Sequence, residues 1–549
     1  GSIPATSDLM ACVAGLPQGM IVLPGLDATL DAQERVALDE THPQYGMYRV
    51  LDHLSIDADD VAVWQWSSIN DRARERARLI GTALAPANVD TCDQVPLNVG
   101  LALPGLSRID CAGAHEEAGV VALALRQALT TQGKTAALVT ADRGLARRVA
   151  AELRRWDVEI DDSAGIPLAD TPPGVFLRLT ATMVGEDLAP TELLATLKHP
   201  LASAGMAIAE FRAMVRTLEI TVLRGPRPAP GFDGLARALT AIGRVDLVSW
   251  LDRLAEMARD FITTMALPTV PLRDMVTAHV GFAEALASGD GISGSERLWS
   301  GEAGEALHEF VVELTSAAGT LSRLDGASWP TLLEALMARR VVRPRFGRHP
   351  RLAILGPLEA RLQLADLVIL GGLNEGSWPP DAETDPWMSR PMRADFGLQS
   401  PERRIGLAAH DFTQAFTGPE ILITRATRIE GTPTVASRWL IAPEITVARN
   451  GHRERIADGA QQWLNWQAEL DRPAVQVTAT KPPCPPIWAR PRRLSVTQIE
   501  TLVRDPYAVY ARHVLGLRAL DEIDADPGAA ERGSVIHDAL DQFFRAFPA

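Results

Sequence analysis

DLVILGGLNEGSWPP, residues 366–380, is the stretch from which the fold of this chain can best be predicted. Its residues Leu367–Leu370 form an unbroken apolar run, which is typical of a strand buried on both faces of a parallel sheet. Two glycines then allow a sharp turn, and two prolines stop the strand from continuing. Asn374, Glu375 and Trp378 are therefore expected in a loop beyond the carboxyl end of the strand, where open α/β sheets bind ligands. An ordinary strand and loop without a binding role fits the same pattern.

The composition around this stretch is that of a soluble globular protein. Of 549 residues, 46% are hydrophobic and 22% are charged, enough for three or four domains. No apolar run approaches the ~18 residues needed to span a bilayer, and the N-terminus has no secretion signal. We expect a cytoplasmic protein with no membrane partner. The four cysteines form no C-x-x-C pair and are interpreted as reduced thiols.

Apolar periodicity divides the chain. Residues 1–107 are interpreted as the end of a first α/β domain, with a strand predicted at 19–24. A second α/β domain is predicted over 108–183 and 341–447, because strand and helix patterns alternate there. Its other expected strands are 136–140, 158–160, 352–355 and 420–424. The remaining predictions are an inserted all-α subdomain at 184–340, a proline-rich linker at 448–493 and a third unit at 494–549.

Charged residues suggest where polar surfaces lie. The chain carries 54 Lys and Arg against 69 Asp and Glu, a net charge of −15, so only a local basic surface is expected to contact nucleic acid. Residues 339–351 hold six arginines and no acidic residue. Arg343, Arg345 and Arg348 are the candidate phosphate contacts. A solvated or internally ion-paired edge remains the alternative. Two further patterns are assigned structural roles, an exposed face for alternating arginines at 72–78 and dipole-stabilising carboxylates at Glu116 and Glu117.

A strand followed by G-L-N-E-G-x-W-P resembles a motif of the AddB- and RecC-like relatives of superfamily 1 DNA helicases. The resemblance implies helicase-like parallel-sheet domains with an inserted all-α subdomain. It does not extend to ATP chemistry. The chain has no G-x-x-x-x-G-K-[ST] phosphate loop, since Lys134 lies in QGKTAALV without the required first glycine and before a strand. Residues 402–404 match the E-R-R of the family's arginine helix, but its phosphate-sensing arginine is replaced by Phe412, so no ATP site is expected.

The third unit resembles the start of a RecB-family PD-(D/E)xK nuclease domain. Arg532, Gly533 and His537 match the family's R-G-x-x-x-H, whose histidine lies at the divalent-metal site. The resemblance thus implies that His537 is a metal ligand and that the complete domain uses Mg²⁺, with its acidic residues and E-x-K lysine expected after Ala549. Many AddB proteins have an iron–sulfur cysteine where this chain has Asp505, so no iron–sulfur cluster is expected.

Together these resemblances imply that the chain is a piece of an AddB-type subunit of a helicase–nuclease that processes double-strand DNA breaks. Its motif sequences most resemble those of alphaproteobacterial AddB proteins. The expected partners are an AddA-type motor subunit, DNA ends and single-stranded DNA, and the expected location is the nucleoid. The inactive helicase-like core would hold and scan DNA while the nuclease domain cuts one strand. A non-catalytic DNA-binding scaffold is the alternative, and a stand-alone active helicase is a weaker one.

Overall fold

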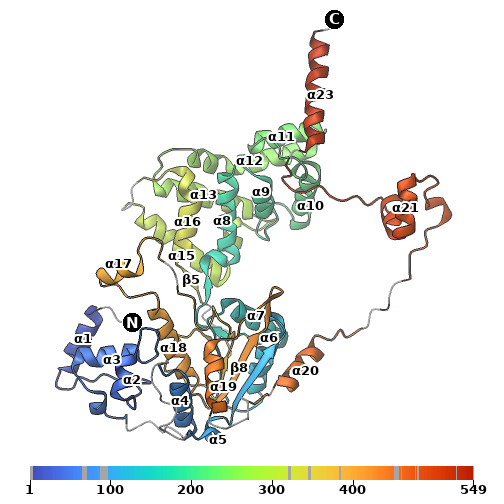
Figure 1. Cartoon of the computed structure of the whole chain (residues 1–549). Helices are drawn as coiled ribbons and strands as arrows, with labels where there is room; N and C mark the ends of the chain where they lie inside the picture. The colour runs from blue at the N-terminus through green and yellow to red at the C-terminus, as the bar shows by residue number, and fades with distance from the viewer. Residues whose placement is uncertain are drawn as a thin grey trace. The chain divides into compact units, whose positions relative to one another are not determined.

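The computed structural model describes residues 4–64, 71–86, 97–319, 323–343, 348–382, 385–449, 457–458, 460–475, 478, 481–526 and 528–547. The chain forms two compact units (Figure 1). The sheet unit comprises residues 1–164 and 346–476, and the helical unit comprises residues 165–345 and 477–549.

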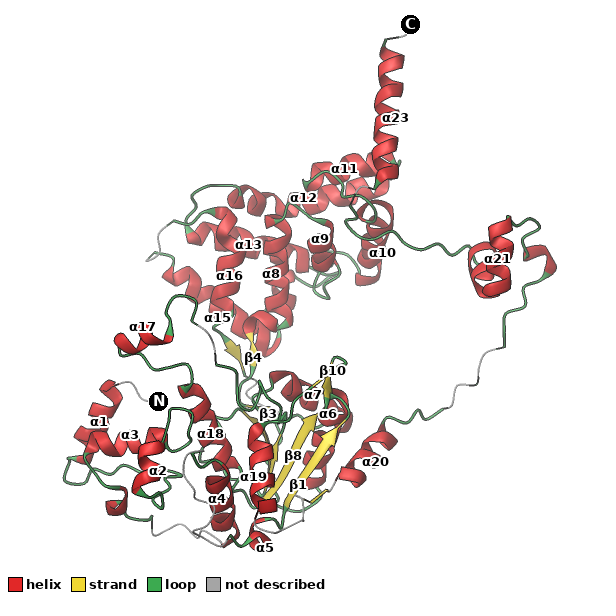
Figure 2. Cartoon of the chain, in the orientation of Figure 1, coloured by secondary structure: helices red, strands yellow, loops and turns green. Residues whose placement is uncertain are grey.

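The sheet unit is built on seven strands in the order β11-β1-β8-β7-β2-β6-β3 (Figure 2). Every pairing between neighbours is parallel, so the carboxyl ends of the strands share one edge. The strands are β1 (Leu106–Cys111), β2 (Ala136–Val139), β3 (Asp161–Asp162), β6 (Leu352–Leu355), β7 (Leu367–Leu370), β8 (Glu420–Ala426) and β11 (Ala457–Asp458). A separate hairpin pairs β9 (Arg428–Ile429) with β10 (Thr432–Pro433). The strands predicted at 136–140, 352–355, 367–370 and 420–424 are confirmed, whereas that at 158–160 lies a few residues later, at β3.

Helices cover both faces of this sheet, as expected when parallel strands are buried on both sides. Ile369 of β7 packs with α6 and α7, while its neighbours Val368 and Leu370 pack with α4, α18 and α19. The helices are α1 (Pro4–Ala14), α2 (Ala32–Ala37), α3 (Tyr45–Leu54), α4 (Asp71–Ala83), α5 (Val99–Ala102), α6 (Ala114–Ala128), α7 (Arg143–Leu153), α17 (Arg390–Asp395), α18 (Arg403–Ala415), α19 (Arg438–Arg449) and α20 (Ala460–Leu470).

The N-terminal part of the sheet unit differs from the strand prediction. The described residues 4–64 contain helices and no strand, so the strand predicted at 19–24 is wrong. Residues 1–107 lie in the same compact unit as the sheet, and their assignment to the end of a first α/β domain stays a prediction. Arg76, counted with an exposed face, is fully buried on α4. It donates to the carbonyls of Ala102 and Pro104, at 2.9 and 2.6 Å, and to that of Gly418 after α18. A buried guanidinium thus ties α4 to two chain turns.

The helical unit is built of helices apart from short strands, and the inserted subdomain predicted at 184–340 stays a prediction. The unit begins at residue 165, α8 packs in its core, and the short strands β4 (Ile166–Pro167) and β5 (Val341–Val342) pair near the two ends of its first segment. Its helices are α8 (Pro172–Gly185), α9 (Pro190–Leu197), α10 (Ile208–Leu218), α11 (Gly231–Ala241), α12 (Val245–Met265), α13 (Leu272–Ala287), α14 (Gly294–Leu298), α15 (Gly301–Ala317), α16 (Trp329–Met337), α21 (Val496–Arg504), α22 (Pro506–Val509) and α23 (Ala529–Ala546). Among the described helices none has the length and apolar character required to cross a bilayer.

The predicted linker at 448–493 is only partly irregular. Within it, β11 extends the sheet beside β1. Trp463 and Leu464 of α20 pack against the hydrophobic cluster to which α6 contributes. The described residues from 481 to 486, before Ile487, form neither helix nor strand, in agreement with the proline-rich composition.

Candidate functional site

The turn after β7 depends on its two glycines. A Cβ atom on Gly371 would lie 2.8 Å from side-chain carbons of both Leu138 and Leu145. Gly372 has a φ of +75°, a backbone conformation that glycine adopts without steric cost. The turn carries Leu373 toward β8, where its N–H donates to the carbonyl of Thr424 at 3.1 Å.

A buried carboxylate fixes this turn to its neighbours. Glu117 of α6 accepts the Gly372 N–H and the Thr424 hydroxyl, both at 2.8 Å. Burial raises the pKa of Glu117 above its usual range, and the two hydrogen bonds act against that shift. The sequence assigned Glu117 to the helix dipole alone, because its partners lie about 250 to 300 positions away in the chain.

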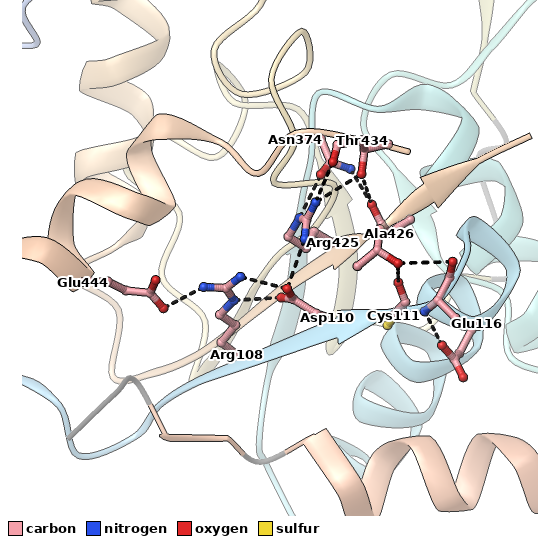
Figure 3. A network of polar contacts seen from close by, with 11 residues as sticks. Arg108, Asp110, Cys111, Glu116, Asn374, Arg425, Ala426, Thr434 and Glu444 are labelled. Atoms are coloured by element: carbon pink, nitrogen blue, oxygen red, sulfur yellow. Dashed lines mark hydrogen bonds and ion pairs between the residues drawn. The ribbon is translucent and has the colours of Figure 1, made fainter. Parts of the chain in front are cut away.

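Arg425, at the end of β8, connects three strands at the carboxyl edge of the sheet (Figure 3). Its Nε donates to Asn374 Oδ1, and its Nη1 donates to Asp110 Oδ2 on β1, both at 3.0 Å. Its Nη2 donates to the hydroxyl of Thr434 at 3.1 Å. Only 6% of Arg425 is exposed, so these contacts are shielded from water.

The network continues along β1. Arg108 donates to both carboxylate oxygens of Asp110, at 2.7 and 2.8 Å, and to Glu444 at 2.7 Å. Burial alone would raise the pKa of Asp110, but the hydrogen bonds from Arg108 and Arg425 hold it below its usual range. Two arginines thus neutralise two carboxylates. This arrangement can hold the sheet edge rigid, and it offers no acid or base poised for proton transfer.

The loop that follows the turn differs from its predicted role. Asn374 is buried and donates to the Ala426 carbonyl at 3.0 Å, and Trp378 is fully buried with its Nε1 donating to the Gly371 carbonyl at 3.2 Å. Neither side chain faces solvent, and each makes a structural hydrogen bond, so DNA contact by these two residues stays a prediction. Glu375 is half-buried and is paired with Arg438 at 2.8 Å. DNA contact at Glu375 stays a prediction.

Trp378 belongs to an aromatic cluster that also contains Phe412, the residue at the family's phosphate-sensing position. Ring centroids lie 5.9 Å apart for Trp378 and Phe412, and 5.4 Å apart for Phe412 and Trp439. Phe412 is fully buried. Lys134 precedes β2 and pairs at 2.6 Å with Glu420, which begins β8, so it lies away from the carboxyl edge.

The arginine-rich stretch at 339–351 does not form one free surface. Arg348 pairs with Asp161, and Arg351 donates to the Thr131 carbonyl at 2.8 Å. Arg343 is exposed in the helical unit, whereas Arg348 belongs to the sheet unit. Arg345 lies outside the described residues. Arg348 is thus ion-paired, and DNA contact by Arg343, Arg345 and Arg348 stays a prediction.

The C-terminal segment has the helix starts that its sequence predicts. Ser495 and Gln498 form a reciprocal capping box, and the Asp505 carboxylate accepts the Ala508 N–H at 3.2 Å. His537 is exposed on α23. Among the described residues, no three His, Cys, Asp or Glu side chains are grouped to hold a metal ion, so His537 has no complete metal site around it there.

Residues 521–526 precede α23 and pack on the rest of the helical unit, and we call them the acidic segment. The N–H of Gly225 donates to the Glu522 carbonyl at 2.8 Å, and the N–H of Ala525 donates to the Gly225 carbonyl at 2.9 Å. Ile523 packs against the helical core, and Arg227 faces Asp524 at 3.8 Å. This contact cannot be predicted from the sequence, because neither segment has a strand pattern.

The cysteines show no paired arrangement among the described residues. Cys111 is buried, and burial raises the pKa of its thiol, so it is a poor nucleophile. Cys12 and Cys484 are exposed free thiols, and Cys92 lies outside the described residues.

Comparison with known proteins adds to this geometry. Residues 493–549 match the family model of the PD-(D/E)XK nuclease superfamily. The C-terminus of this chain carries a PD-(D/E)XK nuclease superfamily domain. This nuclease segment, residues 493–549, contains the capping box, the docked part of the acidic segment and His537.

The relatives found by sequence have no assigned activity. An uncharacterized protein of Rickettsia felis is 25% identical over 257 residues, which cover 46% of this chain and 29% of the relative. An uncharacterized protein of Rickettsia conorii is 25% identical over 253 residues, covering 46% of this chain and 28% of the relative. The matches span less than a third of these curated relatives.

Proposed function

We propose that this chain is part of an AddB-type subunit of a helicase–nuclease that processes double-strand DNA breaks for recombinational repair at the nucleoid. In this proposal the sheet unit is a helicase-like core that holds one DNA strand. An AddA-type partner supplies ATP-driven movement, and the nuclease domain cuts one strand. The match of residues 493–549 to a nuclease superfamily is the observation that carries the proposal.

The sheet unit supports a holding role. Its carboxyl edge is fixed by the Arg425 network and by Glu117, and position 412 is filled by an aromatic ring of the core. An apolar ring cannot stabilise the charge of a phosphoryl group in transfer. Such a core would bind a strand without consuming ATP.

The nuclease segment supports cleavage only in part. Nucleases of this superfamily typically use a divalent metal such as Mg²⁺, and exposed His537 is the candidate ligand in this segment. The described residues offer no group of three such ligands. The alternative is a DNA-binding scaffold without cleavage.

The proposal is tested with the natural protein that contains this chain, purified with and without a motor subunit. We expect it to degrade linear duplex DNA with Mg²⁺ and to stop when EDTA is added. The substitution His537→Ala should lower the rate at least about tenfold, since metal ligands and their supports typically matter on that scale. Substitution of exposed Trp488 by Ala, in the linker, serves as the control. Unchanged cleavage by H537A would remove His537 from the site, and no cleavage by the natural protein would leave the scaffold.

A further inference from the structure

The loop formed by residues 385–404 of the sheet unit displays aromatic side chains to solvent. Trp387 is 88% exposed and Phe396 is 74% exposed, although both belong to the residue types that normally gain most from burial. Met392 and Leu398 are about half-exposed. Figure 1 shows α17, which lies within this loop, at the periphery of the sheet unit. We call residues 385–404 the aromatic loop.

The aromatic loop is braced by its own contacts. Asp385 accepts the backbone N–H of Trp387 at 2.9 Å through one carboxylate oxygen, and accepts Arg393 Nη1 at 2.6 Å through the other. Arg393 also donates from Nε and Nη2 to the Gln399 carbonyl, at 3.1 and 3.0 Å. One guanidinium therefore joins the beginning of the loop to its end. A binding surface that is held in place before its ligand arrives loses less conformational entropy on binding.

The aromatic loop also contains arginines, at positions 390, 393, 403 and 404. Two adjoining grooves of about 370 and 390 Å³ share Asp385, Arg393 and Pro401 in their walls. Their charged lining residues are one aspartate and four arginines: Asp385, Arg390, Arg393, Arg403 and Arg404. Over its whole length the aromatic loop carries these four arginines against Asp385, Asp395 and Glu402, a small positive excess in a chain whose net charge is −15.

The four arginines divide into structural and ligand-facing groups. Arg393 is the brace, and Arg403 is buried with its guanidinium 5.0 Å from the centre of the Tyr45 ring. Arg404 is exposed, and Arg390 is 66% exposed in a surface pair with Glu402 at 2.6 Å. Exposed pairs of this kind contribute little, about 0–1 kcal/mol, so a phosphate can replace the carboxylate at low cost.

We propose that the aromatic loop binds single-stranded DNA, with bases stacked on Trp387 and Phe396 and backbone phosphates held by Arg390 and Arg404. This inference rests on the proposed function, because it names where that function's DNA strand is held. Exposed rings interleaved with arginines are the combination that binds single strands without sequence preference. The exposed arginines Arg390 and Arg404 in the same stretch favour a ligand that carries phosphates over a purely apolar protein surface.

The test measures binding of a labelled oligothymidine of about 15 nucleotides, a length within the usual range for such sites, to the full 549-residue chain. Trp387→Ala and Phe396→Ala should each weaken binding about tenfold or more. Trp488→Ala is the matched control, since this tryptophan is 81% exposed and lies outside the loop. Replacing Arg390 and Arg404 together by Gln should lower the slope of log affinity against log salt by about one.

Three outcomes overturn the inference. Wild-type affinity in both ring variants would show that the strand binds elsewhere, and the proposed function would stand if the natural protein still cuts DNA. Wild-type DNA affinity combined with weaker association of a motor subunit would make the aromatic loop a protein interface. A wild-type chain that binds no oligothymidine would remove the site altogether, and the nuclease assay would then decide the proposed function by itself. Thermal unfolding of each variant checks that folding is intact.

Discussion

Trp378 and Trp387 lie nine positions apart and have opposite environments, so substituting each by alanine gives a direct comparison. Trp378 is fully buried, contacts Phe412 and Trp439, and donates to the Gly371 carbonyl. Removing a buried aromatic side chain of this kind typically costs about 3–5 kcal/mol, because the cavity is only partly refilled. Trp387→Ala should change stability by no more than about 0.5 kcal/mol, since its ring contributes little to the folded core.

A conservative substitution separates packing from hydrogen bonding at position 378. Trp378→Phe keeps a ring in the cluster and removes the indole N–H. The Gly371 carbonyl still accepts the Thr140 hydroxyl at 2.9 Å, so no buried acceptor is left alone. We therefore expect a loss of about 1–2 kcal/mol, much smaller than for alanine.

The assay is urea unfolding followed by hydrogen exchange of peptides that cover β7 and α18, which reports on the sheet unit separately from the helical unit. Trp378→Ala should lower the urea midpoint of these peptides, and Trp387→Ala should leave it in place. The reasoning would be refuted if Trp378→Ala left the midpoint unchanged and weakened single-strand binding as strongly as Trp387→Ala. The loop would then contact DNA as its sequence predicted.

Two further predictions concern the helical unit. Burial lowers the pKa of His279 from 6.5 to about 3, and its Nδ1 accepts the indole N–H of Trp329 at 3.0 Å. The folded state therefore disfavours the protonated ring. The contribution of His279 to the free energy of unfolding is present in full above about pH 6.5 and falls as the pH drops, because the unfolded chain then takes up a proton. We expect the free energy of unfolding to fall by about 2 kcal/mol between pH 7 and pH 5. Urea unfolding at pH 7 and at pH 5 should show this loss in the wild type and a smaller one in His279→Gln. An equal loss in the variant would show that His279 does not cause the pH dependence. Ile523→Asp should release the acidic segment, so that the amides of Gly225 and Ala525 exchange faster; unchanged exchange would show that the anchor is not Ile523.

The central strands could be predicted from the sequence because each is an apolar run that needs no partner to be recognised. The same applies to local caps such as those formed by Asp142 and Ser495, whose side-chain oxygens accept the backbone N–H three residues ahead. The apolar run at 19–24 has the same pattern but forms no strand. A strand also requires a neighbouring strand to complete its hydrogen bonds, and this run has none among the described residues. Sequence periodicity carries no information about that neighbour.

The candidate site was predicted less well, for a physical reason. The fate of Trp378 depends on the positive φ angles of Gly372 and Gly376 and on rings that are distant in sequence, so its inward direction cannot be derived from the loop itself. Arg425 and Glu117 are identified only by partners on other strands. Trp387 and Phe396 carry only a weak local signal in the sequence, two aromatic residues among arginines. This pattern matches none of the family motifs found in the chain.

We propose above all that the sheet unit holds a single DNA strand on the aromatic loop. The most direct measurement is photo-crosslinking of an oligonucleotide that carries 5-iodouracil to the full chain, followed by identification of the crosslinked peptides. We predict crosslinks at Trp387 and Phe396, and their loss in the corresponding alanine variants. Crosslinks confined to other segments, such as residues 374–378 or 339–351, would contradict the claim.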